Sequence, residues 1–213
     1  MLALRLAEGS FNKASSTRVG PGSAVDYDSV RSASACALAV EVASLVLAAI
    51  LLALSLRSHP QAFLYAVELA IYPPFLFAMR RLSRALDEPR IFRYGALVVV
   101  AGAAGLAFAL AAPPATSPRS LAGSAELGAL GLGSYLIVVI DGYLFRRTYE
   151  ALSERTAPIS ASASRRFARA ARWIWLGSLL TIVVVGAVLM SVGAAYALLG
   201  YLELARLRPP AVK

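Results

Sequence analysis

The chain has 213 residues, 59% of them hydrophobic, and carries a formal net charge of +9. Its mean hydropathy of +0.68 is high for a soluble domain of this length. One cysteine and one histidine, Cys36 and His59, exclude an internal disulfide, a multi-cysteine metal or iron–sulfur site, and bis-histidine haem ligation within the chain.

Residues 1–32 form a polar segment, which we expect to lie in the cytoplasm as a tail. It contains Gly20-Pro21-Gly22 and many Ser residues, a composition typical of a flexible segment. Its apolar start is too short for a cleaved signal peptide, and polar residues separate that start from the first long apolar block.

A transmembrane domain is predicted over residues 33–207, followed by a short cytoplasmic tail at 208–213. A helix needs about 20 apolar residues to cross the hydrocarbon core of a bilayer. Five apolar blocks have or nearly have this length, and the sixth is shorter, with 14 residues. In chain order the blocks are 33–56, 61–79, 94–112, 121–145, 173–190 and 192–205.

Lys and Arg residues alternate between the gaps that separate these blocks. Nineteen of the 21 lie in every second gap, counted from the N-terminal tail, and two lie in the remaining gaps. Short loops rich in Lys and Arg stay on the cytoplasmic side of a bilayer. The sequence therefore predicts an all-α bundle of six transmembrane helices in the cell membrane, with both termini cytoplasmic and a tight outer turn at Met190–Gly193.

Three residue types are expected to shape this bundle. The pair Pro73-Pro74 predicts a kink in the second block. Glycines within the blocks predict close helix packing in lipid: Gly102, Gly105, Gly128, Gly131, Gly133, Gly186, Gly193 and Gly200. Aromatic residues near the expected faces predict interfacial anchors: Tyr65, Tyr94, Tyr143, Tyr149, Trp173, Trp175 and Tyr201.

Two expected cytoplasmic segments align at an offset of 66 residues. Residues 80–88 read RRLSRALDE and residues 146–154 read RRTYEALSE. The shared Arg-Arg, Ala-Leu and final Glu indicate an internal repeat, in which blocks two and three correspond to blocks four and five. The alternative is that cytoplasmic helix ends share a preference for Arg, Ala, Leu and Glu.

The same segments resemble a known family. The sequence MRRL at 79–82 with DEPRIFRY at 87–94, YLFRR at 143–147 with ALSE at 151–154, and FARAA at 167–171 leading into LGSLLTI at 176–182 are similar to segments of the domain-of-unknown-function 996 family. The resemblance covers roughly residues 75–205 and departs from the family pattern in the insertion 157–164 and the N-terminal tail. It implies an archaeal multispan membrane protein with no assigned catalytic or binding residues.

Four carboxylates within the apolar blocks are candidate functional groups, because charges in a bilayer are costly and usually face a bundle interior. They are Glu41, Glu68, Glu126 and Asp141. One hypothesis is a proton or cation relay through them. The alternative is hydrogen bonding to Ser, Thr or Tyr at helix contacts, or contact with a partner subunit. We expect Asp141 to pair with Arg146 at the cytoplasmic face.

Cytoplasmic arginines are candidate contacts for anionic lipid or for a protein partner. They are Arg80, Arg81, Arg146, Arg147, Arg165, Arg166, Arg169 and Arg172. In residues 165–172 the basic positions have helical spacing beside apolar ones, which predicts a helix on the membrane surface or against a partner. Nucleic acid is not an expected partner, since no basic and aromatic binding motif accompanies the charge.

The sequence favours a protein without enzyme activity, metal or cofactor, because it lacks a base-and-nucleophile pair and the nitrogen and sulfur ligands of a metal site. We expect an accessory or structural subunit of a larger membrane complex, such as a respiratory or other energy-converting one, in contact with membrane lipids and other subunits. The alternative is a small homo-oligomeric transporter or channel that uses Glu41 and Glu68.

Overall fold

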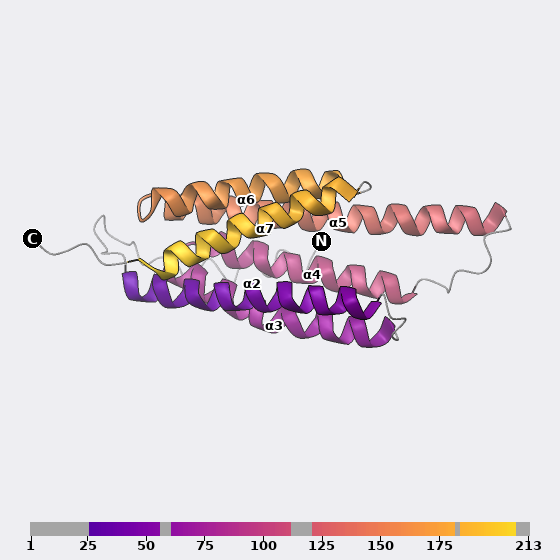
Figure 1. Cartoon of the computed structure of the whole chain (residues 1–213), viewed down its shortest axis with the longest axis horizontal. Helices are drawn as coiled ribbons and strands as arrows, with labels where there is room; N and C mark the ends of the chain where they lie inside the picture. The colour runs from indigo at the N-terminus through magenta and orange to yellow at the C-terminus, as the bar shows by residue number, and fades with distance from the viewer. Residues whose placement is uncertain (1–25, 56–60, 112–120, 182–183, 208–213) are drawn as a thin grey trace, which may run out of the picture.

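The structure is a computed structural model that describes residues 26–55, 61–111, 121–181 and 184–207. This part of the chain is all-helical, as predicted, with no strand (Figure 1). Its helices are α2 (Tyr27–Ser55), α3 (Gln61–Ala85), α4 (Pro89–Ala111), α5 (Leu121–Thr156), α6 (Ala161–Leu179) and α7 (Val184–Ala205).

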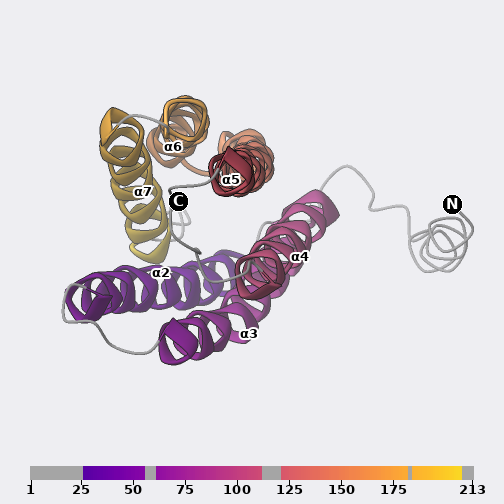
Figure 2. The same cartoon turned by 90° about the vertical axis from the view of Figure 1, so that its right-hand side faces the viewer.

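Each helix packs against the next one in the chain, and α2 also packs against α7, so the bundle closes on itself. Seen along its length, the bundle has two groups of three helices: α2, α3 and α4 form one and α5, α6 and α7 the other (Figure 2). Contacts of α4 with α5 and of α2 with α7 join the groups. The longest helix, α5, extends beyond the others at one end (Figure 1).

Three stretches of the described helices are long and apolar enough to cross a membrane: Tyr27–Leu47, Pro89–Phe108 and Val185–Ala205. Large apolar side chains are exposed on these helices, among them Val46, Val100 and Val188. An apolar surface of this kind in water would be a liability, whereas in lipid it is the ordinary exterior of a helix bundle. The fold thus indicates a membrane protein.

The expected outer turn at Met190–Gly193 is wrong. Helix α6 ends at Leu179, α7 begins at Val184, and α7 continues through residues 190–193. Gly193 instead lets α7 approach α6: a Cβ there would lie 2.9 Å from the backbone nitrogen of Ile174. The glycine is needed for close packing between helices and not for a turn.

The other glycine predictions are partly confirmed. A Cβ on Gly200 would lie 2.8 Å from the Phe167 ring, and one on Gly105 would lie 2.8 Å from Ile137, so both glycines sit at helix contacts. A Cβ on Gly131 would meet nothing within 4 Å, so Gly131 is not a packing glycine. The side chain environment of position 128 lies outside the described part. Helix α3 continues through the predicted kink site at Pro73-Pro74.

Stacked aromatic rings fill the bundle interior near one end. Tyr149 of α5 stacks on Phe145 and on Phe167 of α6, with ring centroids 6.2 and 6.1 Å apart. Tyr201 of α7 meets the Phe167 ring edge-on at 5.1 Å, and Phe75 of α3 meets Phe145 at 6.1 Å. We call these five residues the aromatic core.

The prediction of Tyr149 and Tyr201 as interfacial anchors is therefore wrong, because their relative exposures are only 2% and 1%. Each ring faces neighbouring helices and gains more from ring packing than from a position at the lipid surface. The hydropathy pattern indicated their depth along the helix axis, but their direction around it depends on which helices are neighbours.

Candidate functional site at the basic end

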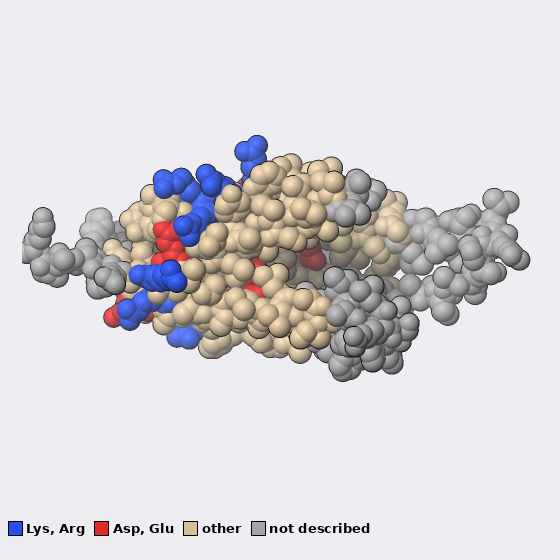
Figure 3. Space-filling model, viewed as in Figure 1, with Lys and Arg blue, Asp and Glu red and all other residues tan. Residues whose placement is uncertain are grey.

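The basic side chains gather at one end of the molecule, and the rest of the visible surface is mostly uncharged (Figure 3). This end holds the start of α2, the α3–α4 turn, the α5–α6 turn and the end of α7. We call it the basic end. The antiparallel order of the helices brings the arginine-rich segments of the sequence together here, although they are far apart in the chain.

The α3–α4 turn is built for a close reversal. Asp87 has a positive φ of 49°, the left-handed conformation that often ends a helix. The backbone nitrogen of Glu88 donates to the Ser83 carbonyl at 2.9 Å, and the Ser83 hydroxyl donates to the Glu88 carbonyl at 3.0 Å. Pro89 then begins α4, where its missing N–H costs nothing. These bonds fix the backbone of Glu88 at the turn.

An ion-pair network around Glu88 joins this turn to the end of α5. Arg90 donates to Glu88 through Nε (2.8 Å) and Nη2 (3.0 Å), and its Nη2 also donates to Glu154 at 2.9 Å. Arg155 lies 3.5 Å from Glu88 and donates to the Asp87 carbonyl at 2.7 Å. The Glu88 side chain is only 10% exposed. The hydrogen bonds from Arg90 and its positive charge, together with that of Arg155, hold the pKa of Glu88 below its usual value.

None of the four residues in this network was among the predicted site residues. A signal for two of them was present, since Glu88 and Glu154 are the equivalent final glutamates of the two aligned segments. Their convergence on one arginine depends on the antiparallel register of α4 and α5, which the sequence pattern does not contain.

The two aligned segments also share a local geometry. The Arg81 guanidinium lies over the Phe77 ring at 5.7 Å, and the equivalent Arg147 lies over Tyr143 at 5.4 Å. Each pair is four residues apart on an exposed helix face, which is the spacing that lets helix side chains meet. The helix continues further in the second segment: α3 ends at Ala85, whereas α5 continues past the equivalent Ala151 to Thr156.

The predicted pair of Asp141 with Arg146 is wrong. Nε of Arg146 instead binds Glu150 at 2.7 Å, and Arg147 binds the same carboxylate at 3.2 Å. A separation of five residues places side chains about 140° apart around a helix, whereas a separation of four places them about 40° apart. Asp141 is partly buried on α5, one residue before the buried Gly142.

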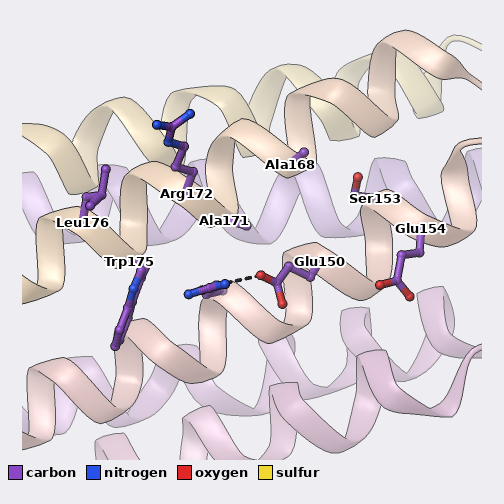
Figure 4. A pocket seen from close by; sticks show the side chains of 9 residues that line it. Glu150, Ser153, Glu154, Ala168, Ala171, Arg172, Trp175 and Leu176 are labelled. Atoms are coloured by element: carbon purple, nitrogen blue, oxygen red, sulfur yellow. Dashed lines mark hydrogen bonds and ion pairs between the residues drawn. The ribbon is translucent and has the colours of Figure 1, made fainter.

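A groove of about 540 Å³ runs between α5 and α6 beside this triplet of charges (Figure 4). Its lining residues are Arg146, Glu150, Ser153, Glu154, Ala168, Ala171, Arg172, Trp175 and Leu176. The Arg146 guanidinium lies 5.7 Å from the centre of the Trp175 ring, and Tyr143 meets that ring edge-on at 5.9 Å. The small side chains of Ala168 and Ala171 leave the space that the groove occupies.

The sequence predicts a surface helix at residues 165–172, but in the structure these residues do not form a separate helix. They belong to α6, whose Ala163, Phe167 and Ala170 are buried, and α6 packs against α5 and α7. Arg166 donates to the Leu199 carbonyl at 2.9 Å and pairs with Glu203 of α7 at 3.1 Å. The apolar face that suggested membrane or partner contact is thus used within the bundle.

The remaining predicted arginines divide into two groups. Arg81 donates to the Ser32 hydroxyl at 3.3 Å, and Arg169 lies over the Tyr196 ring at 5.6 Å. Arg80, Arg165 and Arg172 are exposed and make no ion pair within the described part of the chain. These three have their full charge available to another molecule.

Of the predicted intramembrane carboxylates, Glu41 is the one whose surroundings are clearest. It is partly buried on the α2 face that also carries the fully buried Ser34 and Ala37, seven and four residues earlier. Its carboxyl group is near enough to the hydroxyl groups of Tyr149 and Tyr201, in the aromatic core, to interact with them electrostatically. Glu41 therefore lies on the face of α2 that points toward the bundle interior.

Glu68 and Glu126 belong to α3 and α5, but their side chains lie outside the described part. Of the four carboxylates in the hypothetical relay, the structure thus describes the side chains of Glu41 and Asp141 only. No group of three His, Cys, Asp or Glu residues in the described ranges could hold a metal ion.

The family model described as "Protein of unknown function (DUF996)" matches residues 75–195, which is more than half of the chain. The chain belongs to this family, as the resemblance had indicated. The matched region begins at Phe75 of the aromatic core and includes the α3–α4 turn, the ion-pair network and the groove. Comparison with curated proteins and with solved structures gives no match.

Proposed function

We propose that this family member is a multi-pass membrane protein whose six helices enter the bilayer as three hairpins from the cytoplasmic side. Its basic end then faces the cytoplasm with both termini. Nineteen of the 21 Lys and Arg residues lie in segments that this topology places there.

The α6–α7 hairpin reaches less far from the basic end than α5 does (Figure 1). The Tyr135 hydroxyl of α5 donates to the Leu179 carbonyl at 3.0 Å, so the end of α6 lies level with Tyr135. Tyr135 is eleven residues from Arg146 along α5, or roughly 16 Å at 1.5 Å per residue, against about 30 Å for the hydrocarbon core. A hairpin returns the chain to its starting side at any depth, so this feature leaves the orientation of the C-terminus unchanged.

Orientation can be tested by cysteine labelling. A Cys36→Ser background removes the one native thiol, after which Ser58→Cys probes the α2–α3 connection and Ala157→Cys the exposed α5–α6 turn. A membrane-impermeant maleimide should label Ser58→Cys in intact cells and Ala157→Cys only after permeabilisation. Labelling in the opposite order would contradict the proposed orientation.

Within the membrane, we propose a non-catalytic role as an accessory subunit of a larger assembly. The aromatic core carries this proposal, because it fills the interior near the basic end with ring-to-ring packing from α3, α5, α6 and α7. The Glu88 network likewise uses its charges to tie the helix ends together. Both features favour a rigid packing unit over a passage for solutes.

Purification of the native protein in mild detergent, followed by mass spectrometry of the co-purifying proteins, tests the subunit role. The proposal expects other membrane proteins in fixed stoichiometry with this chain. A particle that contains only this chain and lipid would contradict it.

Transport is the second candidate function, and the inward position of Glu41 favours it. A protonatable carboxylate beside two tyrosines inside a bundle is the kind of group that ion pathways use. In proteoliposomes, Glu41→Gln should abolish a proton or cation flux, whereas Glu150→Gln, whose carboxylate pairs with arginines of its own helix, should leave that flux intact. Equal flux in Glu41→Gln and the unchanged protein would exclude this use of Glu41.

A further inference from the structure

The charge around the α5–α6 groove is unbalanced. Glu150 pairs with Arg146, which lines the groove, and with Arg147, which lies outside the lining, and Arg172 lines the groove without an ion pair in the described part. The other acidic residue of the lining, Glu154, is bound by Arg90 of the ion-pair network. The lining alone is balanced, with two arginines and two glutamates. Together with Arg147, Arg90, Arg155 and Glu88, which are joined to it by ion pairs, five arginines meet three carboxylates, so the surroundings of the groove have a net positive charge.

An aromatic platform lies beside this charge, and an apolar stripe continues from it. Trp175 contacts both the Arg146 guanidinium and the Tyr143 ring. Along α5 from Tyr143, the exposed side chains of Ile140, Leu136 and Leu132 follow at helical spacing, with exposures of 51%, 51% and 60%. Positive charge, aromatic rings and an apolar surface thus succeed one another along one face of α5.

We propose that this groove is a binding site for an anionic phospholipid, with the headgroup phosphate at Arg146 and Arg172 and an acyl chain along the stripe of Ile140, Leu136 and Leu132. The site rests on the proposed membrane insertion, because only a bilayer supplies both parts of the ligand. The order of charge, aromatic ring and apolar side chain matches that of phosphate, glycerol region and acyl chain in a lipid leaflet.

The two arginines have different tasks in this site. Arg146 is already placed by Glu150 and by the Trp175 ring, so it offers a fixed guanidinium edge. Arg172 extends from α6 away from Glu150 (Figure 4), and its long side chain can turn toward a phosphate without breaking an ion pair of the described residues. Arg172 is therefore the residue whose removal weakens binding with least disturbance of the fold.

Trp175 provides a local reporter, since Trp173→Phe leaves it as the sole tryptophan of the chain. The full-length Trp173→Phe protein is reconstituted in phosphatidylcholine vesicles that contain a minor fraction of phosphatidylglycerol. Bromine atoms, which quench tryptophan fluorescence on contact, are placed on the acyl chains of one lipid or of the other. Binding in the groove predicts stronger quenching per mole by brominated phosphatidylglycerol than by brominated phosphatidylcholine.

Arg172→Gln should reduce this preference about fivefold, the factor that corresponds to one arginine at an anionic surface. Arg165→Gln is the matched control, because Arg165 is an exposed arginine of the same helix, two turns earlier, and does not line the groove. It should leave the preference unchanged. Equal quenching by both lipids, or an equal loss in the two variants, would overturn the site in favour of diffuse attraction to the surface.

Two further measurements separate this site from its alternatives. Inorganic phosphate, compared with chloride at equal ionic strength, should not reduce the quenching preference, because it cannot use the apolar stripe. Loss of the preference in phosphate would identify a free-anion site and overturn the lipid assignment. Extraction of the vesicles at alkaline pH tests the proposed function separately: release of the protein refutes membrane insertion, whereas retention without a lipid preference refutes only this site.

Discussion

Removing the charge of Glu88 should destabilise the fold more than removing that of Glu150. In Glu88→Gln, the amide keeps one acceptor oxygen for Arg90, but one of the two charge-assisted hydrogen bonds is lost, the other becomes an ordinary one, and the ion pair with Arg155 disappears. Breaking a buried pair costs about 3–5 kcal/mol, and an exposed pair contributes about 0–1 kcal/mol. The Glu88 side chain is 10% exposed and that of Arg90 is 50% exposed. We therefore expect an intermediate loss, about 1.5 kcal/mol.

The control, Glu150→Gln, removes two ion pairs with Arg146 and Arg147 that lie within one helix. Pairs at these spacings stabilise a helix by about 0.2–0.5 kcal/mol each. The two substitutions should differ in their effect on stability because Glu88 links the start of α4 to the end of α5, whereas the ion pairs of Glu150 lie within α5 alone.

Thermal unfolding of the detergent-solubilised protein, followed by circular dichroism at neutral pH, measures this difference. For a chain of this size, 1.5 kcal/mol corresponds to a fall of about 3–6 °C in Tm, and the two pairs lost in Glu150→Gln correspond to a smaller fall of about 1–4 °C. An equal fall in both variants would refute the reasoning that the Glu88 network holds two hairpins together.

The same experiment has a pH dependence of defined sign. The folded-state pKa of Glu88 lies below its ordinary value of 4.5, chiefly because of the hydrogen bond from Arg90. The stabilisation is therefore fully present above the ordinary pKa and is lost as the pH falls through the lowered one. The Tm difference between the unchanged protein and Glu88→Gln should shrink over that interval. A difference that stays constant to acid pH would contradict a charge-based role.

Three other substitutions test the packing. Tyr149→Ala should cost about 3–5 kcal/mol in unfolding free energy because its ring is 2% exposed in the aromatic core, whereas Tyr149→Phe, which keeps the ring, should cost far less in the same thermal assay. Gly193→Ala should lower Tm, since its Cβ would meet the Ile174 backbone. The control Gly131→Ala, with open space around it, should raise Tm, because alanine adds up to roughly 1 kcal/mol of helix propensity to the unfolding free energy. Arg166→Gln should increase proteolytic opening of the α6–α7 hairpin, because it removes the bonds to Glu203 and Leu199; unchanged cleavage would show that these bonds contribute nothing to hairpin stability.

Apolar block length and arginine spacing were enough to predict a helical bundle with its basic segments at one end. Four of the six helices lie close to the predicted blocks, because a long apolar run bounded by arginines permits little choice of boundary. The turn between the last two helices was predicted at the wrong residues, because apolar residues run almost without interruption from Trp173 to Ala205. Within such a run the turn position is set by which residues pack, as Gly193 against Ile174 shows.

The same division applies to the candidate site. Sequence alone identified Arg146 and Arg172 as candidate lipid contacts and Glu41 as a carboxylate within an apolar helix. The tertiary structure decided that Arg146 binds Glu150, that Glu88 and Glu154 meet at Arg90, and that Tyr149 is core. The physical reason is that hydropathy and charge determine how deep a residue lies along a helix, whereas its partners depend on the rotation and register of neighbouring helices.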